Sequence, residues 1–204
     1  MKVRPISSRP ELLTTCFQSF IAAFKGTEYD LTILLDKPTN EYRTIYKGYK
    51  VEESYYSDFN EGNTKSFHRQ LDLAIEGKRQ YLLVEDDYYF VPQAGKIIST
   101  CTLPFFTPYL HPDYFSGHTH TEKKDVIDHK NTCWMSVQAT TLTFGGQYDA
   151  LLREYETMKK YGWADYPMWC DVTQREKLYT PIPTLATHME HEMLSPFTTW
   201  PFKY

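Results

Sequence analysis

The chain has 204 residues, of which 41% are hydrophobic, 24% are charged and 16% are Phe, Trp or Tyr, and its formal net charge is −4. This composition excludes intrinsic disorder, collagen-like repeats and coiled coil, and the negative charge argues against nucleic acid as a partner. We therefore expect one aromatic-rich globular domain.

The first ninety residues alternate predicted strands and helices. Strands are predicted over 3–7, 29–35 and 81–84, and helices over 10–25 and from about 63 to 77. The helices have apolar residues at helical spacing, and the later two strands are apolar runs. Such an order is typical of an α/β protein with a parallel sheet and right-handed crossovers.

The second half of the chain is less regular. Residues 104–135 hold prolines, histidines and charges, and they are predicted to form long loops. Three elements are expected after them: a strand over 140–144, a helix over 148–161 and, at best, an edge strand over 178–185.

Cysteine usage and hydropathy bear on the compartment. The four cysteines include no CxxC pair, so we expect free thiols in a reducing compartment. No stretch approaches the ~18 apolar residues of a membrane span, and the first residues lack the apolar run of a signal peptide. We therefore expect a cytoplasmic protein (in the host cytoplasm if it is viral) with no integral membrane segment.

Acidic residues follow two of the predicted strands. Asp36 comes at the end of the second strand, and Glu85, Asp86 and Asp87 come directly after the third. Ligands of open α/β sheets gather at the carboxyl ends of strands, and oxygen ligands suit Mg²⁺ or Mn²⁺ holding a substrate phosphate. Because adjacent carboxylates repel one another, a cation or a hydrogen-bond donor is expected beside them. An ordinary acidic turn is the alternative interpretation.

Three segments of the first half share a further pattern. Residues 82–89 read LLVEDDYY, residues 8–13 read SRPELL, and residues 34–36 read LLD. In this order they resemble the metal strand with its DxD motif, the RP segment and the base-binding strand of nucleotide-sugar glycosyltransferases with the GT-A fold. The resemblance is to the small family-2-like enzymes in particular, and it covers residues 1–95 best.

The resemblance implies a fold and a division of labour. The fold would be a single GT-A (Rossmann-like) domain over 1–204, with a central, mostly parallel mixed sheet of about six strands flanked by helices. Residues 1–95 would bind the nucleotide-sugar, and residues 96–204 would bind the acceptor. The implied protein is a phage, viral or bacterial enzyme that builds capsid or surface polysaccharide, and a domain of a larger multi-transferase is equally open.

The resemblance also implies roles for single residues of the donor half. Asp87 would coordinate Mn²⁺ or Mg²⁺, and Asp86 would contact the ribose or share the metal. Asp36 would accept a hydrogen bond from the uracil of a UDP-sugar donor. The role of Glu85 stays open, because many relatives have Asp or Thr there. Four more residues would lie beside the nucleotide: Ser7, Arg9, Lys65 and Arg69. For Lys65 and Arg69, a solvated helix face is the alternative.

Two segments of the second half carry further roles by resemblance. Asp165, in ADYPMW, would be the base that takes the proton of a hydroxyl on a glycan or glycoprotein acceptor, in a transfer with inversion; Asp171 is its local rival, and a transfer with retention stays open. Trp163 and Trp169 flank Asp165, and either offers a face for a sugar ring. His188 would bind the metal or the diphosphate. An acidic helix cap and a packed histidine are the alternatives.

Other functions remain open. A nucleotidyltransferase would use the same carboxylates but would usually bring a basic, Gly-rich phosphate loop, which is not visible near the N-terminus. A non-catalytic carbohydrate-binding module would share the aromatic content. The histidines at 118, 120 and 129 could suggest a metallohydrolase, but we interpret them as scattered loop residues.

Overall fold

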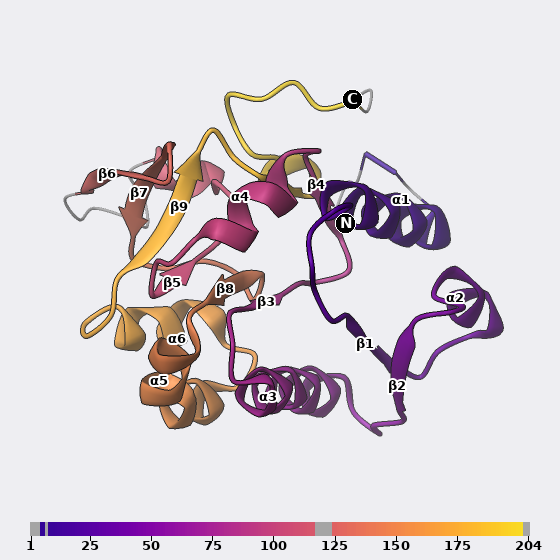
Figure 1. Ribbon diagram of the computed structural model, residues 1–204. Helices are drawn as coiled ribbons and strands as arrows, with labels where there is room; N and C mark the ends of the chain where they lie inside the picture. Colours follow the sequence, from indigo (N-terminus) through magenta and orange to yellow (C-terminus); the bar gives the residue numbers. More distant parts are fainter. Residues whose placement is uncertain (1–4, 7, 117–123, 202–204) are drawn as a thin grey trace.

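The computed structural model of the protein describes residues 5–6, 8–116 and 124–201 (Figure 1). Within these ranges the chain forms six α-helices and ten β-strands. No helix in this part of the chain has the length and apolar character needed to cross a membrane. Ser7 and most of the strand expected over 3–7 lie outside the described residues, as do His118 and His120.

A mixed six-stranded sheet lies at the centre of the protein. Its strand order is β3 (Tyr81–Leu83), β8 (Phe144–Gly146), β5 (Phe105–Phe106), β9 (Leu178–Ile182), β7 (Thr132–Val137) and β6 (Val126–His129). The α/β class and the mixed six-stranded sheet are thereby confirmed. The expectation that most strands pair in parallel is wrong, because only β5 and β9 do so in this sheet.

Apart from β3, the strands of the antiparallel pairs come from the second half of the chain. Strands β6 and β7 form a hairpin within the segment that was expected to be loop, and β8 pairs antiparallel with both β3 and β5. Antiparallel strands need only short connections, whereas parallel pairs need a crossover such as a helix. The strand–helix alternation of the first half therefore does not extend to the central sheet.

Four strands form two smaller sheets. Strands β1 (Thr32–Asp36) and β2 (Lys50–Ser54) pair in parallel, with α2 (Asn40–Ile45) between them along the chain. This unit occupies most of a segment that the sequence leaves unassigned, because β2 is largely polar. Strand β4 (Tyr88–Phe90) pairs antiparallel with β10 (Ala186–His188), which joins the two halves of the chain.

Helices cover both faces of the central sheet (Figure 1). The predictions over 10–25 and 148–161 are confirmed by α1 (Arg9–Ala23) and α5 (Tyr148–Tyr161). Helix α3 (Phe59–Gly77) begins earlier than expected, because a carboxylate oxygen of Asp58 accepts a hydrogen bond from the backbone N–H of Glu61. The remaining two helices are α4 (Ala94–Thr100) and α6 (Asp165–Val172).

Alternation along the strands builds two cores. Phe105 and Leu178 pack with α3, α5 and α6 on one face, while their neighbours Phe106 and Tyr179 pack with α1 and α4 on the other. This two-residue period is the ordinary geometry of a strand, in which successive side chains point to opposite faces. A sheet covered on both faces leaves its strand ends as the place where polar groups can gather.

Strand β9 is central, although its prolines led to the prediction of an edge strand. Its partner β5 covers only Leu178 and Tyr179, so Pro181 pairs on one side alone, with Trp134 of β7. Proline lacks a backbone N–H and is tolerated where one side of the strand carries no ladder. Pro181 therefore fits within a buried strand, and Pro183 lies beyond the end of β9.

Candidate functional site

The acidic motif forms the turn between β3 and β4, and the first residue of α1 reaches it. Nη2 of Arg9 donates to both carboxylate oxygens of Asp86, each at 2.6 Å. Nη1 of the same guanidinium lies 3.9 Å from Oδ2 of Asp87. This Nη1 is buried and makes no hydrogen bond within the described residues. One cation thus faces two adjacent carboxylates, as the sequence indicates.

His188 approaches the same turn from the C-terminal half. Its Nε2 lies 3.2 Å from Oδ2 of Asp87. Strand pairing sets this position, because β10 places His188 opposite Tyr88, and the two rings stack at 5.1 Å and 14°. The Tyr88 hydroxyl is held in turn by the hydroxyl of Thr141 at 2.8 Å. Burial alone would lower the pKa of His188, but the hydrogen bond and the charge of Asp87 outweigh burial and raise it.

Glu85, the first residue of the motif, is held by Thr143. Its backbone N–H donates to the Thr143 hydroxyl at 3.0 Å, and that hydroxyl faces Oε2 of Glu85 at 3.3 Å. Burial, followed by the charge of Asp87, raises the pKa of Glu85 to about 7. Asp165 adds to this rise through its charge, so the first residue of α6 lies within electrostatic reach of the motif.

Asp165 itself is half-buried. It begins α6, and its carboxylate accepts a hydrogen bond from the backbone N–H of Tyr166 at 2.6 Å. Burial raises the pKa of Asp165 above its usual range. Its rival Asp171 is bound elsewhere, by Arg175 at 2.7 Å and by the Tyr161 hydroxyl at 2.9 Å. Of the two aspartates, Asp165 is therefore the one that acts on Glu85.

The tryptophans beside Asp165 differ in exposure. Trp169 is fully buried, and its Nε1 donates to the backbone carbonyl of Thr141 at 3.3 Å. It therefore has no face for a sugar, and the prediction of stacking is wrong for this residue. Trp163 and Tyr166 are 46% and 45% exposed and do present rings at the surface.

Asp36 is held by local partners. Its Oδ1 accepts hydrogen bonds from the Ser54 hydroxyl and from the backbone N–H of Tyr56, both at 3.1 Å. A Cβ added at Gly62 would lie 2.9 Å from Oδ2 of Asp36, so α3 passes close to this carboxylate. These contacts join the carboxyl ends of β1 and β2 to the beginning of α3.

The two α3 cations expected at the nucleotide also have local partners. Lys65 pairs with Glu61 at 2.5 Å, and Arg69 donates to both oxygens of Glu52 at 2.8 and 3.0 Å and to Glu76 at 2.9 Å. Both side chains therefore fit the alternative interpretation, a solvated helix face, on which they form ion pairs with neighbouring glutamates.

The side chains at the acidic turn can be compared with those that a metal ion needs. Among the described residues, no group of three or more His, Cys, Asp or Glu side chains is arranged to hold one. Asp87 and His188 supply one carboxylate oxygen and one imidazole nitrogen within 3.2 Å of each other. A Mg²⁺ or Mn²⁺ ion held by one or two side chains usually completes its shell with water and substrate phosphate oxygens. The pair fits such an open site and does not fit a closed structural site.

Thr141 and Thr143 are site residues that sequence reasoning misses, whereas Tyr88 belongs to the segment LLVEDDYY that carries the resemblance. The two threonines belong to the run TTLT, directly before β8, and they reach the motif because β8 pairs antiparallel with β3. Threonine runs carry no periodic signal, so the pairing of the strands is needed to find them.

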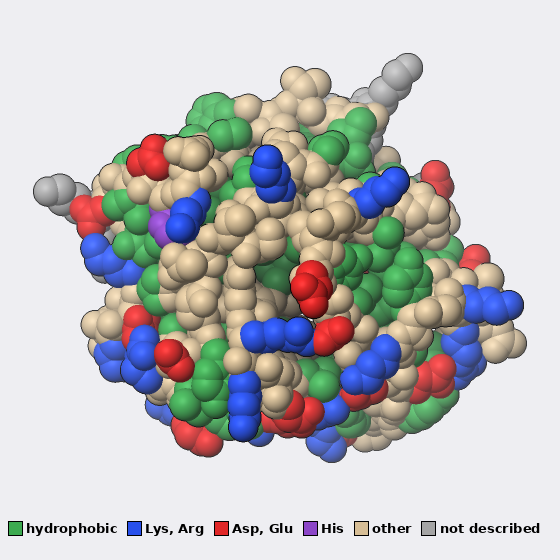
Figure 2. All heavy atoms as spheres, viewed as in Figure 1, with side chains coloured by type: hydrophobic (Ala, Val, Ile, Leu, Met, Phe, Trp, Pro, Cys, Tyr) green, Lys and Arg blue, Asp and Glu red, His purple; other side chains and the backbone are tan. Residues whose placement is uncertain are grey.

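One face of the molecule is mixed in charge. Figure 2 shows acidic and basic side chains interspersed over the face viewed there, rather than gathered into a basic patch. No protein-family model matches the chain, and no curated protein matches it either. A functional assignment therefore depends on the chemistry of this site.

Proposed function

We propose that the protein is a metal-dependent glycosyltransferase that moves a sugar from a UDP-sugar to a hydroxyl group of a glycan or glycoprotein. The observation that carries the proposal is the meeting of Arg9, Asp86, Asp87 and His188 at the end of β3. These four residues come from α1, the β3–β4 turn and β10, so an acidic turn alone does not account for them.

The charged residues at the acidic turn would bind the nucleotide-sugar donor. A leaving nucleoside diphosphate develops negative charge, and groups aimed at that charge lower the barrier. Asp87 and His188 would hold the Mn²⁺ or Mg²⁺ ion, which when bound supplies positive charge to the diphosphate. Asp86 and Arg9, held together at 2.6 Å, would bind the ribose and a phosphate oxygen respectively.

Asp165 would activate the acceptor hydroxyl. A carboxylate whose pKa is raised by burial is a stronger base than an exposed one, because burial disfavours its charged form. Asp165 would take the proton of the acceptor hydroxyl as that oxygen attacks the anomeric carbon. The exposed rings of Trp163 and Tyr166 on either side suit the C–H faces of a sugar.

Calorimetric titration of the whole chain with UDP, GDP and CMP, each with and without Mn²⁺, tests the proposal. We expect binding that requires Mn²⁺ and prefers UDP, and we expect it to be lost in Asp87→Asn. Asp128→Asn is the matched control, because Asp128 is exposed on β6, away from the acidic turn. A nucleotidyltransferase would bind other nucleotides as well, and nucleotide binding that is absent or independent of both metal and Asp87 would overturn the proposal.

A further inference from the structure

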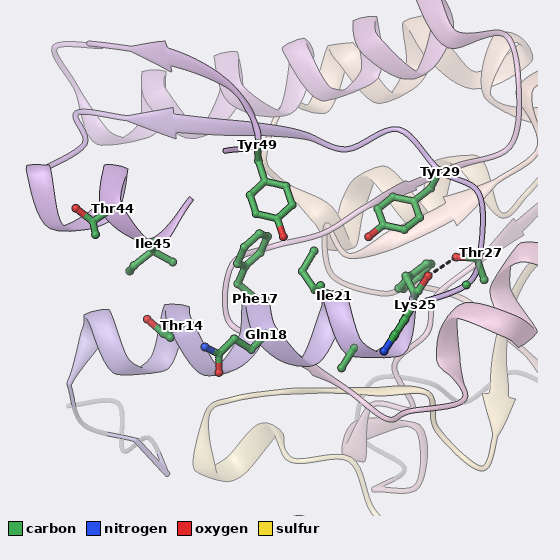
Figure 3. A pocket seen from close by; sticks show the side chains of 13 residues that line it. Thr14, Phe17, Gln18, Ile21, Lys25, Thr27, Tyr29, Thr44, Ile45 and Tyr49 are labelled. Atoms are coloured by element: carbon green, nitrogen blue, oxygen red, sulfur yellow. Dashed lines mark hydrogen bonds between the residues drawn. The ribbon is translucent and has the colours of Figure 1, made fainter. Parts of the chain in front are cut away.

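A hollow in the surface lies apart from the acidic turn. It has a volume of about 980 Å³ and is formed by α1, α2 and the residues that precede β1 and β2 (Figure 3). None of its lining residues belongs to the proposed transferase site. On the face shown in Figure 2, hydrophobic side chains gather in this region, between α1 and the β1–β2 pair.

Two tyrosine hydroxyls converge in the hollow. Tyr29 and Tyr49 enter from the segments before β1 and β2 and point toward Ile21 from opposite sides (Figure 3). The two residues are 39% and 41% exposed, and within the described residues neither hydroxyl makes a hydrogen bond. Burial and the nearby Tyr49 raise the pKa of Tyr29, as expected for two neighbouring hydroxyls.

An aromatic wall and polar groups complete the lining. Phe17 rises from α1 and meets the Tyr49 ring edge to face, with ring centroids 5.0 Å apart. The Gln18 amide and the Thr14 hydroxyl lie on the same side, and the lining includes Lys25 but no carboxylate. The aromatic rings thus lie beside the Gln18 amide and the Lys25 ammonium, whereas the Thr14 hydroxyl already donates to the backbone carbonyl of Pro10 at 2.8 Å.

We propose that this hollow binds a pyranose ring of a glycan. A pyranose presents C–H faces that pack on aromatic rings, and its hydroxyls bond to phenol and amide groups. A purely apolar ligand would cover the two tyrosine hydroxyls and leave them without partners, at a cost in free energy. The lack of carboxylates in the lining admits acidic sugars as well as neutral ones.

The position on α1 separates this site from the donor site. Arg9 at the start of the helix binds Asp86, whereas Ile21 lies twelve residues further on, about 18 Å along the axis at 1.5 Å per residue. The hollow is therefore a distinct subsite, and a glycan chain of a few sugars can reach from one site to the other. The inference uses no residue of the transferase proposal and goes beyond it.

Saturation-transfer NMR on the whole chain tests the inference. The probes are the methyl pyranosides of glucose, galactose, mannose, rhamnose and glucuronic acid. We expect transfer to at least one of them, and binding about tenfold weaker in the double variant Tyr29→Phe/Tyr49→Phe, because two hydroxyls are lost while both rings stay. Tyr55→Phe is the control, since Tyr55 is on the same unit and 65% exposed but lies outside the hollow.

A second arm keeps this inference separate from the transferase proposal. Sugar binding is measured again in Asp87→Asn and in the presence of excess UDP with Mn²⁺, and neither is expected to change it. Displacement of the sugar by UDP would overturn the inference, as would unchanged binding in the double tyrosine variant or no transfer to any probe. Circular dichroism establishes that each variant is folded.

Discussion

Nε2 of His188 lies 3.2 Å from Oδ2 of Asp87, although the two residues belong to opposite halves of the chain. The register of β10 on β4 brings them together, with His188 opposite Tyr88. The strand pair thus holds His188 beside Asp87, which directly precedes β4. We expect the two side chains to act as one unit.

Removal of the imidazole tests this unit. In His188→Ala we expect UDP binding to lose most of its dependence on Mn²⁺, because one of the two side chains that would hold the ion is gone. Transfer should fall by about 10²-fold or more, the usual loss for a preorganised charge. Calorimetry and a transfer assay measure the two effects. Metal-dependent binding equal to that of the wild type would contradict the assignment.

The two arginines expected at the nucleotide should behave differently. Arg9→Met should weaken UDP binding about tenfold, because Nη1 of Arg9, beside Asp87, makes no hydrogen bond within the described residues and is left for a phosphate oxygen. Arg69→Met should leave UDP affinity unchanged, since Arg69 is engaged by Glu52 and Glu76. Titration of both variants with UDP compares them directly, and an equal loss in the two would show that Arg69 reaches the nucleotide.

Asp165 and Asp171 form another matched pair. Asp165→Asn should spare UDP binding but lower transfer by about 10²-fold or more, because the amide cannot take a proton. Asp171→Asn should retain activity and lose only a little stability, as its carboxylate binds Arg175 and Tyr161. Transfer kinetics and thermal unfolding distinguish them. Wild-type turnover in Asp165→Asn would exclude it as the base.

The raised pKa of Glu85 predicts that the stability of the protein depends on pH. This pKa rises from 4.5 to about 7 on folding, so the folded protein binds this proton more tightly than the unfolded chain. The free energy of unfolding should therefore fall as pH rises from about 4.5 to 7, with the full penalty present above pH 7.

Glu85→Gln removes that penalty. The free energy of unfolding of the variant minus that of the wild type should be larger at pH 8 than at pH 4.5, by on the order of 2 kcal/mol. Urea unfolding without metal measures both proteins at each pH. The raised pKa of His188 contributes with the same sign, so the comparison must be made between the two proteins at each pH. A stability difference that does not change with pH would contradict the burial of this carboxyl.

Close packing of β8 predicts a cost for an added methyl group. A Cβ at Gly145 would lie 2.5 Å from the carbonyl oxygen of Tyr81 and 2.6 Å from the Phe106 ring. Gly145→Ala should destabilise the protein by about 1–3 kcal/mol. Gly77→Ala is the control, because its Cβ would meet only Arg79, at 3.9 Å. Urea unfolding measures both, and equal midpoints would contradict the packing.

The local elements of the first half follow closely from the sequence. Apolar residues at helical spacing predict α1, and the run Tyr81–Leu83 predicts β3, because side-chain periodicity records which face of an element is buried. The same reasoning misses β2, whose residues are mostly polar, and the hairpin of β6 and β7, which lies among loop-forming residues. Periodicity is weak in β2 and β6, which have no buried residue, and in β7 the buried residues do not alternate with exposed ones.

The sequence by itself determined the α/β class, the long helices and an acidic motif at the end of a buried strand, because each of these depends on a pattern of residues that are close together in the sequence. Only the tertiary structure decided which distant groups meet that motif: His188 faces Asp87, Thr143 holds Glu85, and Arg69 is bound by Glu52. Strand order and register set those contacts, and they depend on the packing of the whole sheet rather than on any local pattern.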